Sequence, residues 1–114
     1  MESVRQSKVN RLLQKELAEI FRSEAKTLFN DAFISVTQVR VSPDLSFAKI
    51  YLSILKPKDT KKALALVKTQ QFAVKKILVA KIRNQFKVMP ELNFFIDDSY
   101  DYAEKINAIF NKPI

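Results

Sequence analysis

Basic side chains are concentrated in the middle third of this 114-residue chain. Residues 56–87 hold ten lysines and arginines but only one acidic residue, Asp59, in a protein whose net charge is +8. Such side chains can neutralise phosphates, and a localised basic stretch in a folded chain favours a nucleic acid as the partner. A lysine-rich face that only keeps the protein in solution is the alternative interpretation.

The strongest candidates lie in a helix predicted over about residues 72–86. At about 100° per residue, Lys76, Arg83 and Lys87 fall opposite its apolar side, and Lys75 lies at the edge. Cations spaced in this way can follow a phosphate backbone, whereas an exposed face built for solubility usually mixes signs. The same positive field includes Lys61, Lys62 and Lys68, and a secondary RNA-binding patch is predicted at Arg5, Lys8 and Arg11.

The sequence lacks the residue types that several other functions require. The chain has no Cys, no His and no Gly, which excludes disulfides, zinc fingers, thiol catalysis and every glycine-dependent phosphate loop. The acidic residues Asp97, Asp98, Asp101 and Glu104 do not have the spacing of a calcium loop, and we interpret them as a helix cap and solvated charge. We therefore expect no enzymatic activity, no cofactor, no metal site and no small-molecule substrate.

Three aromatic residues on predicted strands, Phe47, Tyr51 and Phe95, have two interpretations. They could form a platform on which RNA bases stack. Alternatively, the C-terminal segment could fold over them through Tyr102, Ile106 or Phe110. We favour this second interpretation, on the premise that the aromatic residues have no basic neighbours on the strands.

Hydrophobic periodicity predicts the elements that carry these residues. A helix is expected over residues 4–29 with Ser3 as its cap, followed by strands near 34–42 and 46–55 joined by a turn at Ser42-Pro43-Asp44. A shift in the apolar alternation of the first strand predicts a bulge. Helical patterns follow from Asp59 or Thr60 to about 69 and over about 72–86, and the sequence leaves open whether these are one helix, a kinked helix or two helices.

A third strand is predicted around Leu92–Ile96, followed by a short helical tail at about residues 100–114. The order α-β-β-α-α-β predicts an α+β fold, in which helices cover one face of a three-stranded sheet. No apolar run is long enough for a membrane span or a signal sequence, so we expect a cytoplasmic protein that does not bind membranes.

Two motifs resemble those of a known family. The hairpin sequence Val39-Arg40-Val41-Ser42-Pro43-Asp44-Leu45-Ser46 and the later segment Pro90-Glu91-Leu92-Asn93-Phe94-Phe95-Ile96-Asp97-Asp98-Ser99 are similar to motifs of ribosome-binding factor A. The first helix, with Arg11-Leu12 before Glu16-Leu17-Ala18-Glu19-Ile20, is also similar. The resemblance covers roughly residues 5–110.

The resemblance implies a single type II KH-like RNA-binding domain over residues 1–114. Family members are bacterial proteins without enzymatic activity that bind the free 30S ribosomal subunit and 16S rRNA. They assist late 30S maturation and 16S rRNA processing, including during cold adaptation. A monomer is expected when the protein is free.

The family replaces the GxxG loop of KH domains with two helices joined at a kink, usually with small residues there. The corresponding segment, residues 67–72, contains neither Ala nor Gly. Thr69, Gln70 and Gln71 are expected at the point of phosphate approach, and Thr69 could mark the bend by bonding the local backbone. Two other functions remain open, namely docking to a ribosomal protein and nonspecific RNA binding.

Overall fold

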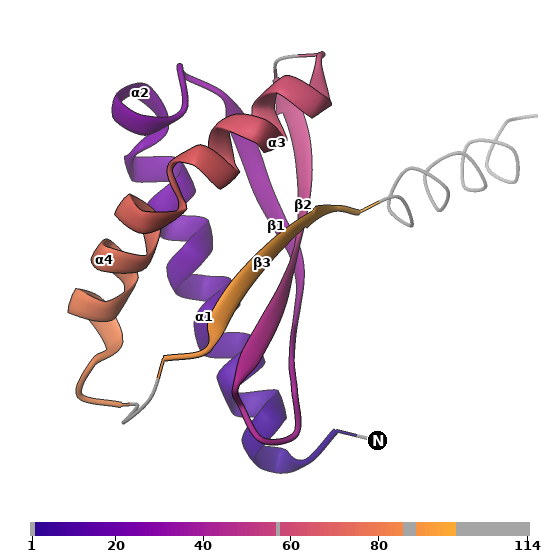
Figure 1. Cartoon of the computed structure of the whole chain (residues 1–114), viewed down its shortest axis with the longest axis vertical. Coiled ribbons are helices and arrows are strands. Elements are labelled where there is room, and N and C mark those ends of the chain that lie inside the picture. Colours follow the sequence, from indigo (N-terminus) through magenta and orange to yellow (C-terminus); the bar gives the residue numbers. More distant parts are fainter. Residues whose placement is uncertain (1, 57, 86–88, 98–114) are drawn as a thin grey trace, which may run out of the picture.

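In the part of the chain that the structure describes, four helices lie on one side of a three-stranded sheet (Figure 1). The computed structural model describes residues 2–56, 58–85 and 89–97, so the predicted C-terminal helix lies outside the described residues. The elements are α1 (Val4–Ser23), α2 (Ala25–Leu28), β1 (Phe33–Val41), β2 (Phe47–Lys56), α3 (Thr60–Thr69), α4 (Gln71–Ile82) and β3 (Glu91–Ile96). The predicted α+β class and the KH-like order of elements are confirmed.

The first helix begins at its predicted cap. The Ser3 hydroxyl accepts a hydrogen bond from the Gln6 backbone N–H at 3.1 Å, and the Gln6 side-chain oxygen accepts one from the Ser3 N–H at 2.8 Å. This reciprocal arrangement satisfies two amides that a helix start leaves without partners. Val9, Leu13 and Leu17 then place a buried apolar stripe against the sheet.

The prediction of one continuous helix over residues 4–29 is wrong in its last part. Regular helix ends at Ser23, and α2 starts again after Glu24. The hydroxyls of Ser23 and Thr27 also donate to the carbonyls of Ile20 and Glu24, a type of local bond that often bends a helix. Asn30 and Asp31 then adopt positive φ angles of 50° and 63°, which reverses the chain into β1.

The sheet has the order β1-β2-β3, with β1 antiparallel and β3 parallel to β2. The predicted bulge is confirmed, because the register shifts between Val36 and Gln38 and leaves Thr37 without a directly opposite residue. The shift brings Val39 and Val41 to the same face as Ile34 and Val36, and all four are buried. The bulge therefore keeps one continuous apolar face along β1.

The core is a single layer between this face and the helices. α1 packs on β1, α3 packs on β3 and β2, and α4 packs mainly on α1. Fully buried residues from the helices and the central strand meet there, among them Leu17, Leu78 and Ile50. No described helix covers the opposite face of the sheet, and no described helix is long and apolar enough to cross a membrane.

The structure resolves the open question about residues 59–86 in favour of two helices. Asp59 caps α3 by accepting from the Lys62 N–H at 3.1 Å, and the two helices meet at Gln70. α4 ends at Ile82 rather than near residue 86, because the Gln85 N–H donates to the Ile82 carbonyl and closes a tighter turn. Arg83 is therefore the C-cap of α4.

Three amide side chains spaced four residues apart attach α1 to the outer edge of β1. Gln6 donates to the Val41 carbonyl at 3.1 Å, and Asn10 accepts from the Val41 N–H at 2.8 Å. Gln14 donates to the carbonyls of Val36 and Thr37 at 3.2 and 3.3 Å, at the bulge. The periodicity of the sequence did not identify these residues, although they satisfy the backbone of an edge strand.

Replacing Gln6 should destabilise the protein. Gln6→Met keeps the length of the side chain but removes the bonds to Val41 and Ser3, and we expect a loss of about 1–3 kcal/mol of unfolding free energy. Urea titration followed by circular dichroism measures the loss. Gln85→Met at an exposed position is the control, and equal midpoints for the two variants would contradict the role of Gln6.

The β1–β2 turn should make stability depend on pH. Hydrogen bonds from the hydroxyls of Ser42 and Ser46 and from the Ser46 N–H lower the pKa of Asp44 from 3.8 to about 2. A carboxylate with a lowered folded-state pKa stabilises the fold above its unfolded pKa, and this contribution disappears as the pH falls through the folded pKa. Asp44→Asn should therefore lower the thermal midpoint at neutral pH, and the difference from the parent should shrink between about pH 4 and pH 2. A difference that is unchanged across this range would contradict the assignment.

Candidate nucleic-acid interface

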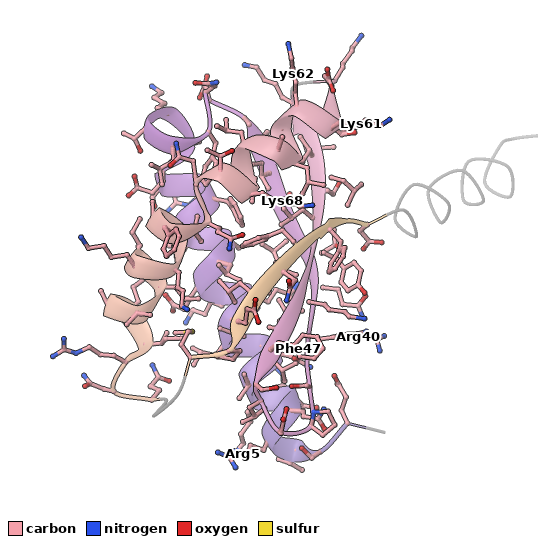
Figure 2. The ribbon with its side chains drawn as sticks, in the orientation of Figure 1. Arg5, Arg40, Phe47, Lys61, Lys62 and Lys68 are labelled. Carbon is pink, nitrogen blue, oxygen red and sulfur yellow. The ribbon has the colours of Figure 1, made fainter. Side chains whose placement is uncertain are left out.

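The basic residues predicted on α3 and α4 lie in solvent. Every described member of the set has an exposed side chain, and Figure 2 shows Lys61, Lys62 and Lys68 on α3. The described members are Lys61, Lys62, Lys68, Lys75, Lys76 and Arg83. Lys87 lies outside the described residues.

The packing of α3 decides how its lysines are arranged. Ala63 and Val67 are buried, so the helical repeat places Lys61 and Lys68 on one flank and Lys62 on the other. Residues seven apart on a helix are separated by about 10 Å along its axis. Lys61 and Lys68 can therefore reach different phosphates of one strand.

α4 presents a second set of cations. Val74, Leu78 and Ile82 face the core, which leaves Lys76 and Arg83 on the solvent side together with Phe72. Lys75 lies on the flank toward β3 and lines a hollow of about 340 Å³ with Gln71, Phe72, Glu91 and Leu92. The hollow joins the start of α4 to the start of β3.

The helix junction has the residues expected for phosphate approach. Thr69 and Gln71 are exposed and Gln70 is half-buried. The Thr69 hydroxyl donates to the Ala65 carbonyl at 2.9 Å, which confirms the local backbone bond expected at the bend. α4 has no side-chain cap, so no side chain competes with an anion for its first amides.

Ion pairs neutralise little of the positive field. Lys81 lies 3.9 Å from Glu16 of α1, and Lys56 lies 3.8 Å from Asp31. The six described candidates on α3 and α4 form no ion pair with any carboxylate in the described part of the chain. Their charges are therefore available to an external anion.

The predicted secondary patch lies on α1. Arg5, Lys8 and Arg11 are exposed on α1, and Arg5 lies at the opposite end of the molecule from Lys61 and Lys62 in Figure 2. The structure therefore places Arg5 far from the lysines at the start of α3.

Sequence reasoning missed an aromatic residue at the interface. Phe72 is 86% exposed at the start of α4, close to the junction and to Lys75. The helix predicted over about residues 72–86 starts at this residue, but no role was assigned to it. Its helical position on the same side as Lys76 was the signal that it faces solvent.

A premise about the strands was also wrong. Lys49 lies between Phe47 and Tyr51 on the same face of β2, and Arg40 of β1 is directly opposite Lys49. The aromatic residues of the sheet therefore do have basic neighbours. The tail expected to cover them lies outside the described residues.

Comparison with known proteins identifies the family. A family model described as ribosome-binding factor A matches residues 5–110. The chain belongs to this family. The ribosome-binding factor A of Cytophaga hutchinsonii is 46% identical over 112 residues, which cover 98% of this chain and 84% of the relative. That of Flavobacterium johnsoniae is 41% identical over 114 residues, covering 98% of this chain and 88% of the relative.

Solved structures support the same fold. The crystal structure of ribosome-binding factor A from Thermus thermophilus has a TM-score of 0.66 and 19% identity, covering 80% of this chain and 94% of that one. A homology model of the Thermus thermophilus factor, fitted into a cryo-EM map of a 30S complex, has a TM-score of 0.62 and 23% identity, covering 78% of this chain and 91% of that one. Both share the KH-like arrangement of helices on one side of a sheet.

Unpaired and paired lysines should respond differently to neutralisation. Lys76→Gln should leave the unfolding free energy within about 0.5 kcal/mol of the parent, because no described partner is lost. Lys81→Gln removes the contact with Glu16 and should lower it by up to about 1 kcal/mol. Urea midpoints of the two variants at low salt test the difference, and a larger loss for Lys76→Gln would show that Lys76 is internally paired.

Proposed function

We propose that this protein is a cytoplasmic ribosome-binding factor that acts as one KH-like RNA-binding domain and has no catalytic role. It binds the free 30S subunit through 16S rRNA and assists late 30S maturation and 16S rRNA processing, including in the cold. Membership of the family and the 30S complex of the Thermus thermophilus homologue support this proposal. The observation that carries it is the set of exposed cations on both sides of the α3–α4 junction, none of which pairs with a carboxylate within the described residues.

The cations contribute by neutralising phosphates. Lys61, Lys62 and Lys68 lie on α3, and Lys75, Lys76 and Arg83 lie on the other side of the junction. Lys87 is proposed as a further contact. Long lysine side chains without fixed partners can adjust to the path of an RNA backbone. Each phosphate contact releases condensed counterions, so affinity should fall steeply as salt rises.

The junction contributes direct contacts. A KH domain normally brings its backbone close to phosphates through glycines, and this chain has none. In their place, the uncapped start of α4 offers backbone amides and the positive end of the helix dipole. Thr69, Gln70 and Gln71 can bond sugar or base edges, and Phe72 can stack against a base. We propose Arg5, Lys8 and Arg11 as a separate, secondary contact.

Reversing two α4 charges should weaken binding to the subunit. Lys76→Glu combined with Arg83→Glu should reduce affinity for free small subunits at least about tenfold and lower the slope of log K against log salt by about 1.5 to 2 units, because two phosphate contacts are lost. Co-sedimentation in sucrose gradients and salt titration measure both effects, and the parent should prefer free small subunits to whole ribosomes.

The matched control combines Arg22→Glu with Lys26→Glu, which changes the net charge equally at exposed positions on α1 and α2. If both double variants bind as the parent does, the α3–α4 assignment is wrong. If unrelated duplex RNA competes as well as the subunit does, binding is nonspecific and the proposed role fails.

A further inference from the structure

The face of the sheet that points away from the helices carries two cations between aromatic residues. Arg40, Lys49 and Asn93 lie side by side on β1, β2 and β3, since Arg40 pairs with Lys49 and Lys49 with Asn93. Phe47 lies two residues before Lys49, and Tyr51 lies two residues after it, opposite Phe95. Arg40, Phe47, Lys49 and Tyr51 line one shallow hollow of about 800 Å³, and Figure 2 shows Arg40 and Phe47 there.

The two cations are poorly compensated within the described residues. Like charges directly opposite each other destabilise a sheet, and neither Arg40 nor Lys49 forms an ion pair with a described carboxylate. The Gln38 amide, with its oxygen turned toward Arg40, orients the guanidinium. This oxygen accepts from Nη2 of Arg40 at 2.8 Å and from Nε at 2.7 Å. Glu91 is opposite Phe47 in the neighbouring row. Asp97 lines the same hollow two rows away, and its carboxylate accepts from the Thr37 hydroxyl. An anionic ligand would relieve the repulsion between Arg40 and Lys49.

The aromatic rings beside these cations are accessible. Phe47 is 38% and Phe95 is 41% exposed, and Tyr51 is half-buried. The Tyr51 and Phe95 rings are 5.8 Å apart with an interplanar angle of 31°, so they form one tilted surface. Alternate residues on a strand are about 6.5–7 Å apart, which places Phe47 and Tyr51 on either side of Lys49. Rings and cations therefore alternate along β2.

We propose that this face binds a single-stranded segment of RNA. Bases stack on Phe47 and on the Tyr51–Phe95 surface, while Arg40 and Lys49 meet the intervening phosphates. Duplex RNA is excluded as the ligand, because its base faces are covered by neighbouring base pairs. This site is on the opposite side of the sheet from α3 and α4, and it rests on the proposed function only in taking ribosomal RNA as the natural partner.

Fluorescence anisotropy with the full chain tests the proposal. The probes are a labelled oligouridylate of about ten nucleotides and a labelled RNA duplex. Phe47→Leu and Tyr51→Leu keep apolar contacts but lose the aromatic face, and each should weaken oligouridylate binding about fivefold or more. Tyr51→Phe should bind as the parent does. Phe33→Leu, at an exposed ring near the other end of β1, is the matched control.

Lys49→Gln should change affinity and stability in opposite directions. It should lower the salt slope for oligouridylate by about 0.7, as expected for one phosphate contact with a single strand. It should also raise the thermal midpoint, because it removes the repulsion with Arg40. Arg22→Gln is the control with the same change in net charge on the helical side.

Unchanged oligouridylate affinity in Phe47→Leu, Tyr51→Leu and Lys49→Gln would overturn the inference. A lowered thermal midpoint in the two aromatic variants with unchanged affinity would also overturn it, and would indicate that the chain's own C-terminal residues cover the face. Failure of the proposed function is distinguishable. In that case the α4 double variant retains subunit binding, while the sheet variants still lose oligouridylate binding.

Discussion

The attachment of α1 to the sheet is the interaction on which the rest of the structure depends. Leu13 and Leu17 fill the single apolar layer, while Gln6, Asn10 and Gln14 bond the backbone of β1. α4 packs mainly on α1, so the cations of α4 depend on α1 for their positions. The same one-sided packing leaves the other face of the sheet free of described helices. Both candidate RNA surfaces therefore follow from the way in which one helix is held.

Local rules were sufficient for most of the architecture. The cap at Ser3, the cap at Asp59 and the turn at Pro43 depend on residues within a few positions, and all three are present. Alternation of apolar residues revealed the bulge at Thr37, because a burial pattern with period two cannot shift without an extra residue. The positive charge on α3 and α4 was equally visible, since charge and helical phase can both be counted along the chain.

Features that depend on distant partners could not be predicted. No proline or glycine marks the interruption at Glu24 or the early end of α4, so the sequence did not reveal these two ends either. Gln14 has the sequence pattern of a solvent-facing residue, and its role depends on the β1 carbonyls to which it donates. Arg40 and Lys49 are nine residues apart in the sequence, and only strand pairing places them opposite each other. Phe72 was given no role, although its helical phase places it on the same side as Lys76.

The absence of glycine has a consequence for β1. Left-handed backbone is found at Asn30, Asp31 and Leu45, on either side of this strand, and each of these residues carries a side chain. Such residues have fewer alternative conformations than glycine. The two chain reversals that flank β1 are therefore conformationally restricted. Slippage by one residue would turn Val39 toward water and the Arg40 guanidinium toward the core. Restricted turns at both ends of β1 therefore oppose a shift in its register. The apolar side chains then stay on the helical face of the sheet, and the Arg40 guanidinium stays on the other face.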